Sequence, residues 1–350
     1  MAANGDWSEI QLSFSSKMIT ESSISHFLKK QYPTSAAQAH SQSESKWQWE
    51  NAVAGAAAGF ATVAATHPLD VVRTRFQVND GRVSNLPTYK NTAHAIMAIG
   101  RCEGFKGLYA GFLPSVLGST VSWSLYFFFY GRAKKRYSQN MDAKLSPGLH
   151  LLSAAEAGAL VCLCTNPIWL VKTRLQLQTP LHRTQPYAGL YDALRTIMRE
   201  EGWSALYKGL VPSLFLQVSH GAIQFTAYEE LRKVVVDYRS KQKNYGSSDI
   251  HVLNSFDYAV LGGSSKVAAM IVTYPFQVIR ARLQQRPSMD GVPKYMDSWH
   301  VVKETVRFEG FRGFYKGIIP NLLKNAPAAS ITFIVYENVV KSLKLMRSND

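Results

Sequence analysis

Cysteine is scarce in this chain of 350 residues, which has only three, at positions 102, 162 and 164. An odd number, with two cysteines separated by a single residue, fits neither a disulfide framework nor the usual spacing of zinc ligands. No pairing of nucleophile and base, no cluster of metal ligands and no phosphate-binding loop recurs along the sequence. The sequence therefore predicts neither an enzyme nor a protein that holds a metal or a cofactor.

Acidic residues are also few, 24 against 39 lysines and arginines, which gives a formal net charge of +15. The first 46 residues contain four acids and four lysines, so the basic excess lies further along the chain. Such a balance favours anionic partners, which include nucleic acid, lipid head groups and small anions. No base-stacking motif accompanies the charge, which argues against nucleic acid. The remaining expected partners are a small anionic solute and membrane lipids, anionic ones included.

Uninterrupted apolar runs of 20 residues are missing, and the mean hydropathy is −0.11. Six segments of about 30 residues are nevertheless rich in apolar residues, and each is long enough to cross a bilayer with some tilt. They are 48–77, 107–136, 148–177, 205–236, 255–284 and 313–342.

Several ionisable residues fall inside these segments or at their ends, among them Asp70, Lys172 and Lys324. At membrane depth such residues are costly unless they face a watery interior. We therefore predict an all-α membrane protein whose six transmembrane helices surround a polar interior. The alternative, a soluble helical-repeat scaffold, would expose aromatic faces such as Leu125–Tyr130 to water.

One pattern occurs three times, as HPLDVVRTR from His67, NPIWLVKTR from Asn166 and YPFQVIRAR from Tyr274. Each of these proline boxes is followed by a tyrosine, a Glu-Gly pair and a second proline at nearly constant spacing. The chain therefore repeats one unit three times, as repeats 47–137, 146–237 and 254–344. Between the two long helices of each repeat we expect a short amphipathic helix on the membrane surface. These helices are expected at 90–101, 188–200 and 296–308.

The segment before the first repeat, residues 1–46, contains 11 serines and has no signal-peptide core. We expect it to be a disordered amino-terminal tail. Its serine content suits a plastid transit peptide, whereas its four acids and its lack of arginine do not.

The boxes, in three copies of about 100 residues, resemble those of the mitochondrial carrier family over residues 48–342. The resemblance implies a barrel of six tilted helices with threefold pseudosymmetry, one central substrate site and transport by alternating access. We expect the protein to function as a monomer.

The departures from the family pattern indicate the cargo. Pro167-Ile168-Trp169 is similar to the box of carriers for flat heteroaromatic solutes, and the surrounding sequence is most similar to the folate/FAD carriers, including those of the plant chloroplast. The resemblance therefore implies folate transport across the inner chloroplast envelope membrane. FAD, NAD and pyrimidine nucleotides are alternative cargoes, and the mitochondrial inner membrane is the alternative location.

The resemblance also implies a box gate, in which the acid of one box pairs with the first basic residue of the next. Asp70 with Lys172 fits this scheme, whereas Trp169 and Gln277 occupy the other two acid positions. Gln277 can only form a hydrogen bond with Arg73. Beneath the gate the family uses a glutamine brace, and the corresponding residues are Gln77, Gln176 and Gln284.

An opposite gate is expected on the second long helix of each repeat, with an aromatic residue, an acid and a basic residue three positions later. Tyr228, Glu229 and Arg232 match this pattern. Tyr336 and Glu337 lack the basic residue, because position 340 is a valine. Both gates are therefore depleted in charge.

A folate offers a flat pteridine and glutamate carboxylates, so its site requires an aromatic face and cations. Trp169 can supply the stacking face, although it can also pack between helices or lie in the interfacial belt. We assign Arg280 to a carboxylate, with Gln277 or a helix-end carbonyl as the alternative partner. Asp70 and Lys172 are assigned to the gate rather than to the substrate, whereas Arg73 is included among the substrate's cations.

Midway along the second long helices, the family contacts its substrate at three equivalent positions. Here these positions hold Gly118, Leu216 and Lys324. Lys324 is the one cation among the three, whereas Gly118 and Leu216 leave room for a ring. Lys266 replaces a packing glycine of the other repeats, so it must face the interior or snorkel, and Glu156 is its expected pairing partner.

Overall fold

The computed structural model describes residues 34–80, 89–138, 147–179, 186–242, 255–287 and 294–348, and their regular structure is helical throughout. These residues form two compact units, which we treat separately. One consists of residues 34–70 with 323–348, and the other of Val71–Leu322.

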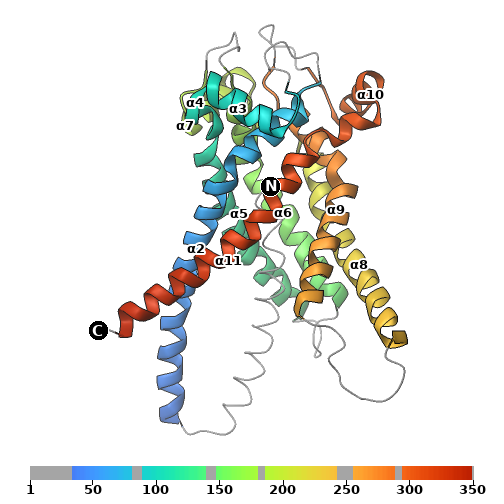
Figure 1. Cartoon of the computed structure of the whole chain (residues 1–350). Helices are drawn as coiled ribbons and strands as arrows, with labels where there is room; N and C mark the ends of the chain where they lie inside the picture. The colour runs from blue at the N-terminus through green and yellow to red at the C-terminus, as the bar shows by residue number, and fades with distance from the viewer. Residues whose placement is uncertain are drawn as a thin grey trace. The chain divides into compact units, whose positions relative to one another are not determined.

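The order of elements repeats three times as a long helix, a short helix, a single turn and a second long helix (Figure 1). The first long helices are α2 (Thr34–Val78), α6 (Pro147–Leu177) and α9 (Ser255–Leu283). The short helices are α3 (Thr92–Cys102), α7 (Leu190–Glu200) and α10 (Ser298–Glu309). The turns are α4 (Gly104–Leu108), η1 (Trp203–Tyr207) and η2 (Phe311–Tyr315). The second long helices are α5 (Phe112–Ser138), α8 (Leu210–Gln242) and α11 (Ile318–Ser348).

The short helices lie within two residues of their predicted bounds. Two of them begin at a side-chain cap, where Asn91 accepts a hydrogen bond from the His94 amide (2.8 Å) and Asp297 accepts one from the His300 amide (2.7 Å). In Figure 1 they lie at the same end of α5, α6, α8 and α9.

The second long helices begin about five residues later than predicted. The cause is a glycine in the left-handed region before each helix, at Gly111 (φ 72°), Gly209 (φ 79°) and Gly317 (φ 85°). A side chain would strain this conformation, so each glycine separates the preceding turn from the helix that follows it.

The first helix begins earlier than predicted. Residues 34–46, which we assigned to the tail, belong to α2. They contain neither glycine nor proline, so nothing in this stretch stops a helix. The remainder of the predicted tail, residues 1–33, lies outside the described residues.

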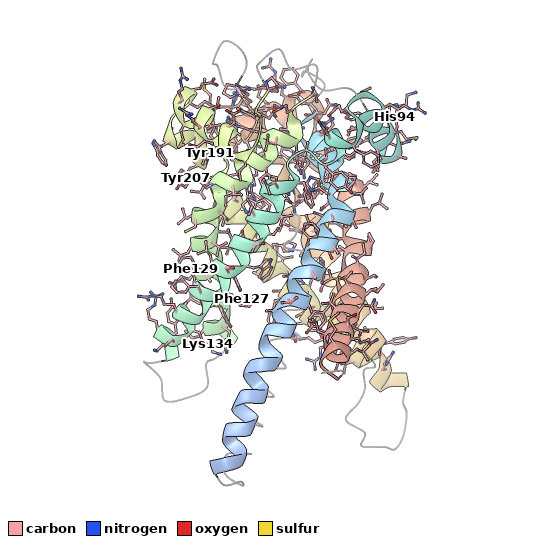
Figure 2. The ribbon with its side chains drawn as sticks, turned by 90° about the vertical axis from the view of Figure 1, so that its left-hand side faces the viewer. His94, Phe127, Phe129, Lys134, Tyr191 and Tyr207 are labelled. Carbon is pink, nitrogen blue, oxygen red and sulfur yellow. The ribbon has the colours of Figure 1, made fainter. Side chains whose placement is uncertain are left out.

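Four helical segments in the described ranges are long and apolar enough to cross a membrane: Ala52–Val78, Gly104–Tyr137, Gly148–Leu177 and Phe311–Leu343. The helices α8 and α9 have similar lengths, but polar residues such as Gln224 and Lys266 lower their hydropathy. Aromatic side chains are exposed on the outer surface, as Figure 2 shows for Phe127 on α5 and Tyr191 on α7, which are 55% and 78% exposed. Such a surface suits lipid better than water.

Within the unit Val71–Leu322, a buried ion pair joins each proline box to the Glu-Gly landmark of its own repeat. The three guanidinium side chains have no exposed surface. The pairs are Arg75–Glu103 (2.5 Å), Arg174–Glu201 and Arg282–Glu309 (2.7 Å). Burial by itself would raise the pKa of Glu201, but hydrogen bonds from Arg174 and Lys208 hold it below its ordinary value.

The same arginines connect the repeats in a ring. Each donates from Nε to the main-chain carbonyl of the brace glutamine in the next box. These bonds are Arg75 to Gln176 (3.0 Å), Arg174 to Gln284 (3.2 Å) and Arg282 to Gln77 (3.1 Å). The carboxyl-terminal ends of α2, α6 and α9 are thereby held together.

Candidate substrate site and gates

The indole of Trp169 on α6 is buried between a glycine and a lysine. It is 6% exposed and faces Gly118 on α5, where an added Cβ would lie 3.4 Å from Trp169 Cζ2. Lys172 Nζ lies 4.9 Å from the centre of the indole ring, which is a cation–π contact. The side of Gly118 is therefore occupied by the protein's own Ile168 and Trp169, rather than open for a substrate ring as we expected.

Two buried arginines lie near each other on α2 and α9. Arg73 is 8% exposed and Arg280 is 7% exposed, and the two guanidinium groups interact electrostatically. Arg73 donates from Nη2 to Gln277 Oε1, which is the contact expected for this glutamine. Two like charges in a buried setting favour an anion between or beside them.

The brace glutamines are buried, and all three form side-chain hydrogen bonds to another repeat. Gln176 and Gln284 accept from the threonine of the neighbouring box, whereas Gln77 donates to a tyrosine because Ala281 replaces the third threonine. The bonds are Thr74 Oγ1 to Gln176 Oε1 (2.7 Å), Thr173 Oγ1 to Gln284 Oε1 (2.9 Å) and Gln77 Nε2 to Tyr274 OH (3.2 Å).

In the other unit, Lys324 on α11 forms an ion pair with Asp70 on α2. Its Nζ lies 3.1 Å from Asp70 Oδ1, and the two side chains are 8% and 4% exposed. Lys324, which we assigned to the substrate, therefore contacts the acid of the first box. The predicted pair of Asp70 with Lys172 would join the two units and stays a prediction.

Residues of the opposite gate are more exposed. On α8, Tyr228 and Glu229 are half-buried and Arg232 is exposed. On α11, Glu337 pairs with Lys341 at 3.7 Å, one helical turn away, with both side chains about two-thirds exposed. We missed Lys341 because the family pattern places the basic residue three positions after the acid rather than four.

The remaining predicted site residues lie on α8 and α9. Leu216 is buried, and Lys266 is half-buried within electrostatic range of His220. Glu156 is not the partner of Lys266 that we expected. It accepts hydrogen bonds from Arg136 and from Tyr137 OH (3.0 Å) on α5, which lies beside α6 in the chain and in space.

A polar contact between the first and third repeats was not predicted from the sequence. The buried carboxylate of Asp80, at the end of α2, lies 2.7 Å from Lys294 Nζ and accepts a hydrogen bond from Tyr295 OH (2.8 Å). Tyr295 is the tyrosine landmark of the third repeat, but position 80 belongs to no landmark, so the repeat pattern does not predict this contact. Across the described part of the chain, no three His, Cys, Asp or Glu side chains gather as a metal site would require.

The arrangement of three helix–short helix–helix repeats with boxes joined in a ring defines a membrane carrier. The family model "Mitochondrial carrier protein" matches residues 44–141, 143–239 and 251–347, and the chain belongs to this family, whose fold has six membrane-spanning helices.

Among known proteins, the chain is 74% identical over 299 residues to "Folate transporter 1, chloroplastic" of Arabidopsis thaliana, covering 85% of this chain and 96% of the relative. It is 40% identical to "Nicotinamide adenine dinucleotide transporter 1, chloroplastic" of the same plant, covering 84% and 91%. It is 31% identical to a mitochondrial pyrimidine nucleotide transporter of Saccharomyces cerevisiae, covering 84% and 86%.

Proposed function

We propose that this chain transports folates by alternating access, as a monomer in the inner membrane of the chloroplast envelope and without covalent chemistry. The observation that carries the proposal is the 74% identity, over 85% of this chain and 96% of the relative, to a protein named as a chloroplastic folate transporter. The mitochondrial inner membrane is the second candidate location, because a less similar relative, 37% identical, is named as mitochondrial.

The residues around the proline boxes suit the chemistry of a folate. The indole of Trp169 offers an aromatic edge or face to a pteridine, and Lys172 lies over the same ring. Arg73 and Arg280 are buried cations that can hold glutamate carboxylates through paired N–H donors. We assign membrane lipids, anionic ones included, to the exposed aromatic and basic outer surface.

Carriers named for NAD and pyrimidine nucleotides are also similar to the chain, and their cargoes share a flat heterocycle and negative charge. The proposal is tested with the purified full chain in liposomes, by letting unlabelled folate, FAD, NAD and UTP compete with labelled folate for uptake. We expect saturable folate uptake that unlabelled folate inhibits at the lowest concentration. Inhibition of folate uptake by NAD, FAD or UTP at a lower concentration than by unlabelled folate would overturn the assignment of the cargo.

A further inference from the structure

Equivalent positions of the repeats form pairs between neighbouring long helices. One member lies seven residues after the left-handed glycine, midway along the second long helix, and the other lies two residues after the proline of the next box. The pairs are Gly118 with Trp169, Leu216 with Gln277, and Lys324 with Asp70. The structure shows direct contact for the first pair in one unit and for the third pair in the other.

The two contacting pairs are complementary in different ways. Lys324 and Asp70 form a buried ion pair, whereas Gly118 and Trp169 combine the smallest residue with the largest. A Cβ built on Gly118 would lie 3.2 Å from Ile168 Cγ2, 3.4 Å from Trp169 Cζ2 and 3.5 Å from Trp169 Cε2. The distance to Ile168 is tighter than an ordinary van der Waals contact, so even an alanine requires Ile168 to move by a few tenths of an ångström. The two distances to the indole are at the close end of ordinary contact, so the alanine methyl would press directly against the ring.

We propose that Gly118 sets the affinity of the site for folate by positioning Trp169. Because position 118 has no side chain, the indole packs against the backbone of α5, and this fixes how far the ring extends toward a bound pteridine. Gly118 is therefore a positioning residue that acts through Trp169, and it is not itself a contact for the substrate. This inference rests on the proposed function.

A side chain at position 118 would press against Ile168 and against the indole at Cζ2 and Cε2. Interiors are closely packed, so the indole can yield only by shifting away from α5. The stacking face for the substrate would be displaced, while the helices of the transport cycle would stay intact. We expect a change in the apparent affinity for folate rather than in the maximal rate.

The experiment measures KM and the maximal rate of folate exchange in liposomes for the full chain and four variants: Gly118→Ala, Trp169→Phe, the two combined, and Gly221→Ala. Gly221 is the matched control, since it lies in α8 and a Cβ there would meet nothing within 4 Å. Both alanine substitutions gain the same helix propensity, so their difference reports the contacts of position 118 with Ile168 and Trp169. The combined variant separates the contribution of Trp169 from that of Ile168.

We expect Gly118→Ala to raise the KM for folate about tenfold with less than about a twofold change in maximal rate, which is typical of a modest overpacking effect. Gly221→Ala should leave both parameters unchanged. In the combined variant the smaller phenylalanine ring makes room for the alanine, so its KM should be no higher than that of Trp169→Phe alone.

One result would contradict the positioning role of Gly118, and a different result would contradict the stacking role of Trp169 in the proposed function. If Trp169→Phe raises KM but Gly118→Ala behaves like Gly221→Ala, or if the two effects multiply, Gly118 does not position Trp169 and the proposed site stands. If Trp169→Phe leaves the KM for folate unchanged, the stacking role in the proposed function is wrong. Thermal unfolding of each variant in detergent identifies any variant whose fold has been lost, and Gly118→Ser then provides a second small substitution that must raise KM as well.

Discussion

The pair Lys324–Asp70 and the pair Gly118–Trp169 occupy equivalent positions of the repeat, but different interactions hold the two pairs together. The first is a buried ion pair at 3.1 Å, which is strong only while both partners are present. The second is an apolar contact with no directional bond, in which shape decides the fit. The comparison indicates that one repeat junction keeps a charged contact suited to gating, whereas another has exchanged it for an aromatic ring suited to a flat solute.

The largest effect is expected from removing one charge of the ionic pair. Asp70→Asn leaves the buried ammonium of Lys324 without its carboxylate, which costs about 3–5 kcal/mol in comparable buried pairs. We expect a clear fall in the melting temperature and loss of folate exchange.

The control for this prediction removes both charges. Asp70→Asn combined with Lys324→Met should be more stable than Asp70→Asn alone, because no uncompensated charge is left inside the protein. A double variant that is less stable by the sum of both single effects would show that the ion pair is not what stabilises this junction.

The next effect concerns Arg280, the buried cation that we assign to a folate carboxylate. Arg280→Ala should weaken folate binding by about 2–5 kcal/mol, as expected when one partner of a buried charged contact is truncated. Arg280→Lys keeps the charge but loses the paired donors, so it should recover only part of the affinity. Binding is measured by competition against labelled folate. Equal affinities of the wild type and Arg280→Ala would exclude a carboxylate contact at this residue.

A smaller effect is expected when the aromatic face itself is removed. Trp169→Ala should reduce folate affinity by about 1–3 kcal/mol, by analogy with the stacking of nucleic-acid bases on aromatic side chains. The matched control is Trp203→Ala, because Trp203 is 72% exposed on the turn η1. The same affinity loss in both variants would mean that the effect does not come from stacking at the site.

The sequence predicted the order of helices well because three copies of each landmark confirm one another. The short helices were placed within two residues, because each is an amphipathic segment that ends next to a Glu-Gly pair. The starts of the second long helices were misplaced by about five residues. Their limit depends on the backbone conformation of single glycines such as Gly111, which composition does not reveal.

The candidate site was predictable residue by residue but not contact by contact. Trp169, Lys324 and Gly118 were identified from their positions in the repeat. Their contact partners lie on neighbouring helices, and the sequence alone does not give the distances between helices. The contact of Asp80 with Tyr295 spans 215 residues and joins a tyrosine landmark of the third repeat to a position outside the landmarks. Contacts of this kind follow from how helices pack, so only the structure shows them.

The smallest effect is expected for a second ion pair on α11, which separates burial from charge as the cause of the first prediction. Lys341 and Glu337 are about two-thirds exposed, in contrast to the buried Lys324 and Asp70. An exposed pair one helical turn apart contributes about 0.3–0.5 kcal/mol, because water screens both charges. Lys341→Ala should therefore shift the melting temperature by at most about 2 °C. A shift as large as that of Asp70→Asn would mean that Lys341 is buried during the transport cycle. The ion pair of the opposite gate would then stabilise the protein as much as the buried pair of Asp70.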